Sequence, residues 1–480
     1  MQGITTVANA IGGTPLVSLL GVDGVGGRNS AEILGKLEFM NPGGSIKDRV
    51  AKHIVRQLAA KGVPSDALLI VAGPGNLAIS LAMLGRNLLC LIPERTSTDR
   101  INLLKAMGVT DIVRTLDGAL PGSPEHPAEI AKRIIRQHPA GILVDEESGE
   151  WDLHACYEEL AGEIVEQVGG KLDALVLGVD TGNAATHLSQ VLKRRLPGVQ
   201  IVGVEPSNSA INGDATRNPL AHRWLCEDIG RAYAPRALSP SAIDMWIRVS
   251  DQIAYSMARR LIRAGIFAGP SAGAAVAAAQ MYARTSLQPD ARIAVILSDS
   301  ARNYTTTLLS DDWMLAHDLM DTPMLDDLQR KQHEQYRAAS IEDLQLPAAI
   351  TVSEGDSMQA AIALMTENDF SQVPVTGPNR RLIGYLTLAA AQALLDNGTA
   401  MPGQPVGKFM LRFASRSARD GSGIRRYWLI TPETPLSELA KFFEIHSVAF
   451  VTDPSRKFCL GIATKQDLIT FLARRNTHQF

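Results

Sequence analysis

Short apolar runs alternate with amphipathic stretches along this chain from about residue 30 to residue 310. Runs such as DALLIVAG, LLCLIPE and VQIVGVE have the length and composition of buried strands, and helix-like sequence follows each of them. Strands that are joined by crossover helices pair in parallel, and helices cover both faces of the sheet. The pattern therefore predicts an α/β fold with parallel sheets and a ligand site at the carboxyl ends of the strands.

The C-terminal third contains an internal repeat. Residues 350–397 and 428–474 both show the order strand, amphipathic helix, strand, turn, strand, helix, which indicates two units that pack as a pair. Residues from about 311 to 345 are charged and irregular, as is typical of a partly helical connector. The expected domains are 1–312 for the α/β part, 313–345 for the linker, 346–398 for the first repeat and 406–475 for the second.

Composition narrows the classes of partner. The 47 Lys and Arg residues nearly balance the 50 Asp and Glu residues, so we expect small-molecule and protein partners, with no nucleic acid and no membrane. No segment reaches the roughly 18 apolar residues of a spanning helix, and the N-terminus lacks a signal-peptide pattern. The widely spaced cysteines, which favour reduced thiols in a cytoplasmic protein, are Cys90, Cys156, Cys226 and Cys459. His154 lies near Cys156, but such isolated pairs are usually packing residues, so we expect no metal.

Lys47 follows a Pro-Gly-Gly turn in the segment NPGGSIKDRVAKHIVRQL. Ser45 and Asp48 have the spacing of a capping box, which puts Lys47 in the first turn of a helix. The apolar residues that follow at helical spacing are Val50, Ile54 and Leu58. The helix dipole disfavours an ammonium at this position and lowers the cost of a neutral amine, which can form a Schiff base with an aldehyde cofactor. Most lysines in a first turn are nevertheless solvated surface residues.

Five segments resemble the successive signatures of cystathionine beta-synthases and cysteine synthases. They are IGGTPLVSL, KLEFMNPGGSIKDR, VGVEP, GPSAGAAVAAA and VILSDSARNYTTTLLSDDWM. The last segment favours the cystathionine beta-synthase branch, and the C-terminal repeat resembles the paired CBS motif of that branch. The resemblance implies a two-subdomain, parallel-sheet pyridoxal 5'-phosphate (PLP) fold of type II, similar to the tryptophan synthase beta subunit, followed by a tandem CBS (βαββα) regulatory pair.

The resemblance also implies an activity. A lyase of this type uses PLP to condense serine, or a serine-like substrate, with homocysteine or another thiol through an aminoacrylate, as in transsulfuration and cysteine biosynthesis. Lys47 matches the Schiff-base lysine, Asn76 the asparagine that bonds to the ring oxygen of the cofactor, and Ser300 the serine that faces the pyridine nitrogen. A neutral hydroxyl at that nitrogen suits loss of a β-leaving group. We expect a homodimer or homotetramer and no haem.

The loop that matches the family's phosphate cradle, usually GTGGT, departs from the pattern. It reads Asp180-Thr181-Gly182-Asn183-Ala184. Such a cradle points backbone N–H groups at a phosphate ahead of a helix. Asp180 brings a carboxylate to a position where a dianion binds, so the affinity for PLP should fall unless Asp180 turns outward or meets a cation.

The loops that match the substrate contacts depart as well. The usual TSGNT is replaced by Gly73-Pro74-Gly75-Asn76-Leu77. Both hydroxyl donors are lost, and proline has no amide hydrogen to donate. Glu146 matches a glutamine at the next carboxylate contact, and an anion there repels a substrate carboxylate. Asp228 stands where the family has a glycine in the mobile loop.

These departures leave three interpretations open. The chain is an ordinary cystathionine beta-synthase of reduced efficiency, or an enzyme retuned to a substrate that lacks a free carboxylate or carries a cationic group. The third interpretation is a catalytically inactive homologue that acts as a regulatory or binding protein.

The second repeat carries the residues that contact a nucleoside in the CBS-pair family. Thr464 and Asp467 match the threonine and aspartate that contact a ribose and a phosphate, whereas the first repeat keeps Thr387 but has Ala390 at the acidic position. At most one site is therefore expected, for S-adenosylmethionine or an adenine nucleotide. The alternative is that Asp467 merely caps its helix.

Overall fold

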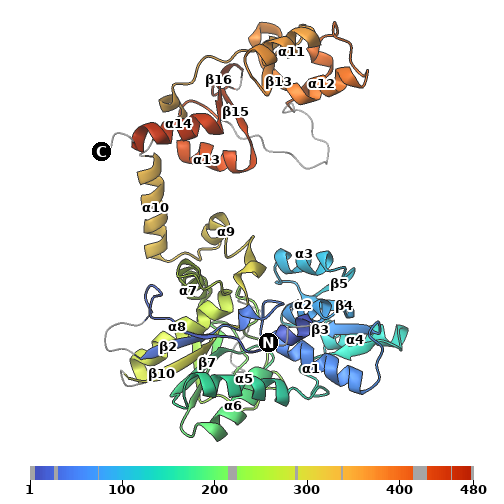
Figure 1. The fold of residues 1–480 in the computed structure, drawn as a ribbon, viewed down its shortest axis with the longest axis vertical. Helices are drawn as coiled ribbons and strands as arrows, with labels where there is room; N and C mark the ends of the chain where they lie inside the picture. Colours follow the sequence, from blue (N-terminus) through green and yellow to red (C-terminus); the bar gives the residue numbers. More distant parts are fainter. Residues whose placement is uncertain are drawn as a thin grey trace. The chain divides into compact units, whose positions relative to one another are not determined.

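The computed structural model describes residues 6–25, 31–73, 75–213, 224–286, 290–336, 339–413, 430–455 and 457–476. The chain divides into two compact units, Met1–Met324 and Leu325–Phe480 (Figure 1). No helix among the described residues is both long enough and apolar enough to span a bilayer.

The first unit holds two sheets, and both are mainly parallel as the alternating pattern predicts. The larger sheet has the order β1-β2-β10-β7-β8-β9, in which β1 is antiparallel to β2 and all other neighbours are parallel. Its strands are β1 (Leu16–Ser18), β2 (Glu32–Lys36), β7 (Ala174–Gly178), β8 (Gln200–Pro206), β9 (Met245–Val249) and β10 (Arg292–Ile296).

The smaller sheet is entirely parallel and has the order β5-β4-β3-β6. Its strands are β3 (Leu68–Ala72), β4 (Asn87–Pro93), β5 (Asp111–Thr115) and β6 (Ile142–Val144). The apolar runs did not indicate β5 or β9. Both are edge strands with exposed residues, which interrupt the continuous apolar run of a buried strand.

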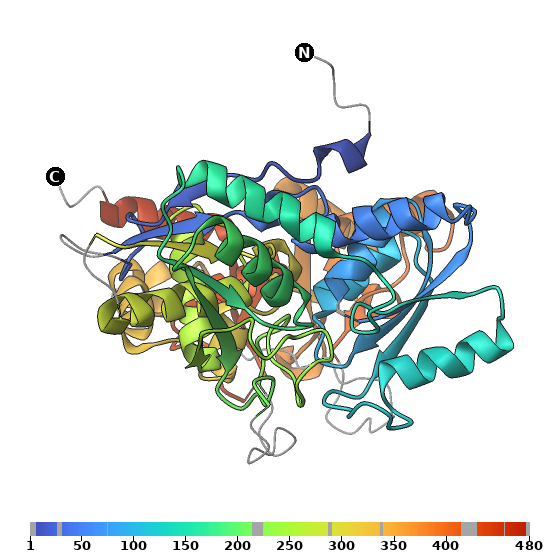
Figure 2. The same cartoon turned by 90° about the horizontal axis from the view of Figure 1, so that it is seen from below.

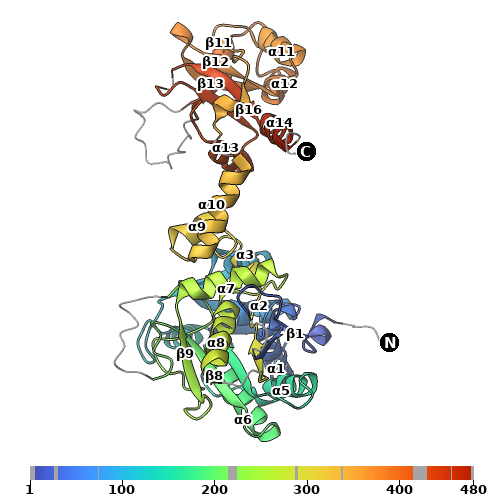
Figure 3. The same cartoon turned by 90° about the vertical axis from the view of Figure 1, so that its left-hand side faces the viewer.

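Helices cover both sheets. In the first unit they are α1 (Lys47–Ala60), α2 (Gly75–Met83), α3 (Thr98–Ala106), α4 (Pro127–Gln137), α5 (His154–Gln167), α6 (Asn183–Arg195), α7 (Asp251–Arg263), α8 (Pro270–Ser286) and α9 (Asp311–Ala316). Three short 3₁₀ turns are η1 (Val7–Ala10), η2 (Glu38–Met40) and η3 (Ala301–Tyr304). Helix α8 runs along the larger sheet beside β8 and β9 (Figure 3), and α4 packs on the smaller sheet (Figure 2).

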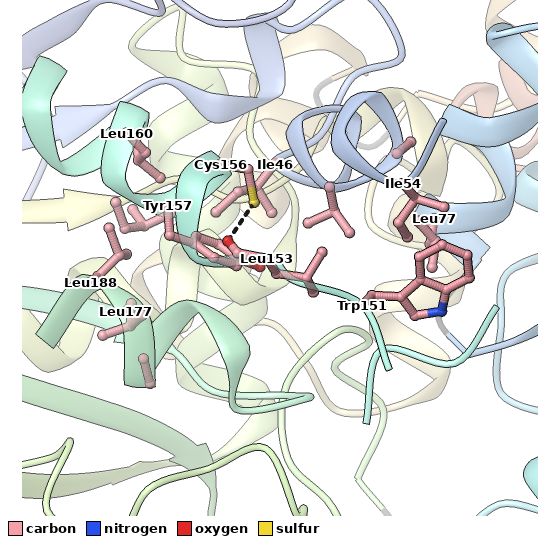
Figure 4. Close-up of a cluster of buried hydrophobic side chains, with 14 of the residues drawn as sticks. Ile46, Ile54, Leu77, Trp151, Leu153, Cys156, Tyr157, Leu160, Leu177 and Leu188 are labelled. Carbon is pink, nitrogen blue, oxygen red and sulfur yellow. Dashed lines mark hydrogen bonds between the residues drawn. The ribbon is translucent and has the colours of Figure 1, made fainter. Parts of the chain in front are cut away.

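The apolar face predicted for α1 is confirmed. Val50, Ile54 and Leu58 are at most 1% exposed, and full burial of one such side chain contributes roughly 1.5–3 kcal/mol. They belong to the core that joins the two sheets, in which Cys156 also lies; Figure 4 shows Ile54 and Cys156 there. This packing fixes α1, and with it the position of Lys47 at the start of the helix.

The second unit contains the two repeats. The first consists of β11 (Val352–Ser353), α11 (Met358–Glu367), β12 (Gln372–Thr376), β13 (Leu382–Thr387) and α12 (Leu388–Asp396), with β14 (Leu411–Arg412) added to its sheet. The second consists of α13 (Leu436–Ile445), β15 (Val448–Thr452), β16 (Cys459–Thr464) and α14 (Lys465–Asn476). The remaining elements are α10 (Thr322–Tyr336), η4 (Ile341–Leu344), η5 (Pro378–Arg380) and η6 (Val406–Lys408).

The predicted order of elements is present in the first repeat and largely in the second. The first strand expected for the second repeat is missing among the described residues from Ile430 onward, although the Ile430 carbonyl accepts a hydrogen bond from the Thr452 amide (2.9 Å). Residues 414–429 lie outside the described residues. The two repeats meet through Tyr385 and Phe450, whose ring centroids are 5.5 Å apart.

The cysteines are free thiols, and Cys90, Cys156 and Cys226 are buried. The Cys156 thiol donates a hydrogen bond to the Leu153 carbonyl (Figure 4). The His154 ring packs edge to face against the His187 ring. Within the described ranges, no cluster of three or more His, Cys, Asp or Glu side chains is placed to hold a metal.

Candidate active site

Lys47 lies in a pocket of about 580 Å³ where the two sheets of the first unit meet. The wall of the Lys47 pocket includes Asn76 from α2, the loop after β7, and Ser298 after β10. Because the loops after β7 and β10 follow the carboxyl ends of parallel strands, the site is where the fold class predicts it.

Glu146 holds the amine of Lys47. Its Oε2 atom lies 2.6 Å from Lys47 Nζ and accepts a second hydrogen bond from Thr181 Oγ1 (3.0 Å). Burial alone would lower the pKa of Lys47, but attraction by Glu146, and then by Asp180 and Asp228, raises it. The expectation that the helix dipole would favour a neutral amine was therefore wrong, because three carboxylates outweigh the dipole.

The predicted capping box is also wrong. Helix α1 begins at Lys47 with Ile46 as its N-cap, and Ser45 Oγ accepts from the Lys47 amide (3.2 Å). The Asp48 carboxylate accepts from the Gly43 amide (2.6 Å) and from the hydroxyl of Ser80 (2.5 Å). Asp48 therefore ties the glycine turn to α2 and does not bond to the Ser45 amide.

The loop of residues 180–184 leads into α6, as a phosphate cradle would. Gly182 is the N-cap of α6 at φ 86°, and a Cβ atom there would lie 2.6 Å from Leu238 Cβ, so this position requires glycine. Asn183 Nδ2 donates to the Glu146 carbonyl (2.8 Å), and Ala184 lines the Lys47 pocket. The loop thus positions Glu146 while it leaves the helix N-terminus facing the pocket.

Asp180 forms an ion pair with Arg231. Its Oδ1 atom lies 2.9 Å from Arg231 Nε, and another nitrogen of the same guanidinium lies 3.0 Å from Glu147 Oε1. Burial alone would lower the pKa of Arg231, but Asp180 and Glu147 raise it well above its usual range. Local sequence patterns do not indicate this pair, because Arg231 lies in an irregular loop far along the chain.

Asn76 is held by acidic neighbours. Its Nδ2 atom donates to Asp228 Oδ2 (2.6 Å) and to Asp299 Oδ2 (3.3 Å), and its Oδ1 accepts from Asn303 (3.1 Å). Asp228 adopts φ 57°, a left-handed conformation that glycine tolerates best. The glycine that the resemblance places at this position would adopt the same conformation without strain.

Arg100 is the centre of this acidic cluster, and it was missed by the sequence analysis. Its side chain is 1% exposed and pairs with Glu227 (3.1 Å), Asp228 (2.5 Å) and Asp299 (2.7 Å). It also donates to the Tyr304 hydroxyl. An arginine in the first turn of an amphipathic helix is normally a surface residue, so its local sequence did not indicate the cluster.

The other predicted contact residues are more dispersed. The Ser300 hydroxyl accepts from the Arg302 amide (3.3 Å) as the N-cap of η3, and the serine of this segment that lines the Lys47 pocket is Ser298. Gly73 and Gly75 line two adjoining pockets. Pro74, between them, lies outside the described residues.

The adjoining pockets continue the Lys47 pocket. A connecting pocket of about 320 Å³ shares Asp180 and Asp228 with it. A Trp224 pocket of about 840 Å³ shares Arg95 and Arg231 with the connecting pocket. The three pockets are therefore neighbours that share wall residues.

Comparison with protein families assigns this architecture. Residues 7–299 match the family described as "Pyridoxal-phosphate dependent enzyme". The chain belongs to this family. Residues 341–391 and 424–474 match the CBS domain, and each match falls on one of the two repeats. The pyridoxal-phosphate dependent fold of type II, the CBS pair and the cystathionine beta-synthase branch are thus confirmed.

Individual relatives support the branch. The chain is 33% identical to cystathionine beta-synthase of Dictyostelium discoideum, over 98% of this chain and 92% of that protein. It is 30% identical to that of Saccharomyces cerevisiae, over 97% of each. The crystal structure of the O-acetylserine dependent cystathionine beta-synthase from Helicobacter pylori matches with a TM-score of 0.57 and 28% identity, over 64% of this chain and 99% of that one.

The cofactor of this family is PLP, and the residues of the Lys47 pocket fit it. Lys47 can supply the amine that reacts with the aldehyde of PLP. The N-terminus of α6 can bind the phosphate, and the position of Gly182 there has no room for a Cβ atom because Leu238 packs against it. Asp180, which was expected to oppose phosphate binding, pairs with Arg231, although Arg231 also pairs with Glu147. The Lys47 pocket therefore offers an amine for the aldehyde of PLP and a helix N-terminus for its phosphate.

In the second repeat, Thr464 and Asp467 bond to each other. Asp467 Oδ2 accepts from the Thr464 hydroxyl (2.6 Å) and amide (2.8 Å), and Thr464 Oγ1 accepts from the Asp467 amide (3.4 Å). These reciprocal bonds cap α14. Thr387 caps α12 in the first repeat by accepting from the Ala390 amide (3.3 Å), without an acidic partner.

Proposed function

We propose that this enzyme catalyses a β-replacement in which serine, or a serine-like amino acid, condenses with homocysteine or another thiol. The observation that carries the proposal is the position of Lys47 Nζ inside a pocket that also faces the N-terminus of α6. The names of the Dictyostelium and Saccharomyces relatives support the choice of reaction. PLP, when bound, supplies an electron sink for negative charge at the substrate α-carbon.

The residues of the chain have distinct proposed roles. Lys47 links to the cofactor and, once released, removes the proton from the substrate α-carbon. Glu146, 2.6 Å from Nζ, orients that amine, and Thr181 orients Glu146. The α6 N-terminus binds the phosphate, and Asn76 and Ser300 are the proposed contacts to the cofactor ring.

Absorption spectroscopy tests the proposal. The purified protein with PLP should absorb near the blue edge of the visible range, and borohydride should fix the cofactor to the peptide that contains Lys47. Serine should shift the spectrum, and homocysteine should then yield cystathionine. A Lys47→Arg variant should show none of these. A wild-type protein that stays colourless with added PLP would support the inactive, regulatory homologue instead.

We propose a single adenosyl ligand site in the second repeat, at Thr464 and Asp467. The first repeat has Ala390 at the position of Asp467, which supports the choice of the second repeat. The capping bonds of Asp467 compete with a ligand. Calorimetry with S-adenosylmethionine and with ATP on the full chain tests it. Asp467→Asn should abolish the heat of binding, whereas Asp396→Asn, at the end of α12, should leave it unchanged.

We also propose a cytoplasmic homodimer or homotetramer. The free thiols of the four cysteines support a reducing compartment. Light scattering on the eluting protein measures the mass, and a value near the 51.6 kDa of one chain would contradict the assembly.

A further inference from the structure

The Trp224 pocket lies at the carboxyl end of the smaller sheet. In the order β5-β4-β3-β6, the chain continues from β3 to β4 and β5 on one side and places β6 on the other side. Open parallel sheets bind ligands in the crevice at such a switch point. Ala72 at the end of β3 and Asp145 after β6 both line the Trp224 pocket, so it occupies this position.

Asp145 is an acid of this pocket without a paired cation. Its Oδ1 atom accepts a hydrogen bond from the Glu147 amide (2.9 Å), and it forms no ion pair with any residue that the structure describes. Burial raises the pKa of the Asp145 carboxyl, and the Glu147 amide and the more distant Arg231 oppose this rise only in part. An ammonium group beside Asp145 would supply the missing charge.

Arg95 is placed to receive a carboxylate. Its guanidinium lies over the Trp224 ring, 4.7 Å from the centroid, and this stacking fixes the plane of the group. Its side-chain contacts to protein oxygens are long, 3.9 Å to Asp117 Oδ1 and 3.5 Å to the Gly230 carbonyl. Asp117 is held through its other oxygen by the Arg95 backbone amide (3.1 Å). A planar guanidinium held in this way can bind a carboxylate through two parallel N–H···O bonds.

The Thr115 hydroxyl lies at the same edge of the sheet. Thr115 is 2% exposed and lines the Trp224 pocket, and its Oγ1 atom has no hydrogen-bond partner within the described ranges. Its register partner is Pro93 at the end of β4, two residues before Arg95. A buried hydroxyl without a partner is unfavourable, so a ligand that bonds to it gains affinity.

Several other polar side chains of the pocket are paired with one another. Glu147 lies 3.0 Å from a nitrogen of Arg231 and accepts from the Tyr233 hydroxyl (3.2 Å). His126 Nδ1 accepts from the Ala128 amide (3.3 Å), and its Nε2 atom lies 3.0 Å from the Tyr233 hydroxyl. The pocket therefore presents to a ligand one acid, one cation and one hydroxyl that are poorly partnered in the protein.

We infer that the Trp224 pocket binds the thiol substrate as an amino-acid zwitterion, with its ammonium group at Asp145 and its carboxylate at Arg95 and Thr115. The inference rests on the proposed function, which requires a thiol, and narrows that thiol to one that carries both charges, as homocysteine does. The Trp224 pocket shares Arg95 and Arg231 with the connecting pocket, which in turn adjoins the Lys47 pocket. The thiol substrate is thus held beside the pocket in which the first amino acid reacts.

Calorimetry on the full-length, PLP-free Lys47→Ala variant tests the inference without turnover and without thiol chemistry at the aldehyde. The probes are homocysteine, 3-aminopropanethiol, which lacks the carboxylate, and 4-mercaptobutanoate, which lacks the ammonium group. Homocysteine should bind at least about tenfold more tightly than either analogue, because each analogue leaves one charge of the pocket unmatched. No binding of homocysteine, or an analogue that binds as tightly, would overturn the inference.

Two further substitutions in the Lys47→Ala chain locate the charges. Arg95→Gln should weaken homocysteine about tenfold and leave 3-aminopropanethiol unchanged, and Arg95→Lys should recover part of the loss. Asp145→Asn can still accept from the Glu147 amide, so it should weaken homocysteine about tenfold and leave 4-mercaptobutanoate unchanged. A substitution that weakens all three probes equally would contradict the assigned contacts.

Matched controls lie on the same elements but away from the pocket. Arg133→Gln on α4 and Asp111→Asn at the start of β5 each neutralise an exposed side chain, and both should keep the full affinity for homocysteine. The melting temperature of each variant shows whether it is folded. Equal losses in the control variants would show that the overall field of the protein, and not the Trp224 pocket, sets the affinity.

Steady-state kinetics separates this inference from the proposed function. In the PLP-loaded chain with Lys47 in place, Arg95→Gln should raise the KM for homocysteine about tenfold and leave the KM for serine unchanged. A chain that takes up no PLP contradicts the β-replacement, yet the calorimetry still decides whether the pocket binds the zwitterion. Conversely, cystathionine formation in which neither Arg95→Gln nor Asp145→Asn changes the KM for homocysteine supports the β-replacement and overturns the Trp224 pocket as the thiol site.

Discussion

Two buried ion networks in the first unit differ in how well their charges balance. Away from the Lys47 pocket, Lys36 and Arg49 face Glu38 and Glu163, so two cations meet two acids. Beside the pocket, the single guanidinium of Arg100 faces three carboxylates. The first arrangement serves the framework, whereas the second leaves excess negative charge beside the ligand site.

The pKa values of the two networks differ in direction. Burial alone would raise the pKa of Glu163, but hydrogen bonds from Arg49 and Lys36 lower it to about 2. Burial raises the pKa of Glu227 to about 7. Arg100 only partly opposes this rise, because the nearby carboxylates of Asp228 and Asp299 also raise the pKa. Balanced charge therefore stabilises ionised acids in the framework, while unbalanced charge at the site favours their protonation or the approach of a cation or N–H donor.

Removal of Arg100 should give the largest effect. Arg100→Met leaves three acids in the protein interior without their cation, and we expect a loss of about 3–5 kcal/mol in the free energy of unfolding at pH 7. Urea unfolding followed by circular dichroism measures it. The loss should shrink at pH 5, because protonation of the acids relieves their repulsion.

Arg49→Met is the matched test in the balanced network. It should be less destabilising than Arg100→Met, at about 3 kcal/mol, because Lys36 remains paired with Glu163. An equal or greater loss for Arg49→Met would show that charge balance does not distinguish the two networks.

Neutralising Glu227 and neutralising Glu163 should change the free energy of unfolding with opposite pH dependences. Because the folded pKa of Glu227 lies above its ordinary 4.5, the charged form destabilises the fold, and stability falls as pH rises from about 4.5 to about 7. Glu227→Gln should therefore gain on wild type across that window, by on the order of 3 kcal/mol. Urea unfolding at a series of pH values between 4 and 8 measures the gain.

Glu163→Gln should behave in the opposite way. The lowered pKa of Glu163 contributes stability that is present above about 4.5 and is lost as pH falls toward about 2. The variant should be less stable than wild type at pH 7, by on the order of 3 kcal/mol, and should match it near pH 2. Parallel pH profiles for the two variants would contradict the assignment of opposite shifts.

The same contrast shows what the sequence could predict. The buried strands of both sheets, the helix that starts at Lys47 and the repeat pair follow from local periodicity, which is strong where burial is complete. Asp180 was singled out from the sequence as an altered residue of the expected cradle. Its partner Arg231 was not, because the pairing depends on how distant loops pack.

Arg100 shows the limit most clearly. Its partners Asp228 and Asp299 lie 128 and 199 residues further along the chain, and no local pattern indicates that the three side chains meet. Edge strands β5 and β9 were not predicted for a related reason, because their exposed residues interrupt the apolar pattern of a buried strand. Charge balance is a property of tertiary contacts, which single-sequence periodicity does not report.

The Asp180–Arg231 pair lies between the two extremes, with one cation for two acids, and it gives the smallest predicted effect. Arg231→Gln leaves the Asp180 carboxylate without a counter-charge at the loop proposed to bind the PLP phosphate, so the Kd for PLP should rise about tenfold, or ~1.4 kcal/mol. Fluorescence titration of the PLP-free protein measures this Kd. Arg292→Gln, which breaks an ion pair with Glu32 at the far end of β10, should leave it unchanged.

A double-mutant cycle separates counter-charge from structure. Asp180→Asn alone should bind PLP at least as tightly as wild type, because a charge that repels the phosphate is gone. The double variant with Arg231→Gln should recover most of the tenfold loss, since the arginine is no longer needed to neutralise Asp180. If the double variant stays as weak as Arg231→Gln, Arg231 contributes to the site through its contact with Glu147 or through the phosphate itself, and the charge that the cradle gained at Asp180 has no part in PLP affinity.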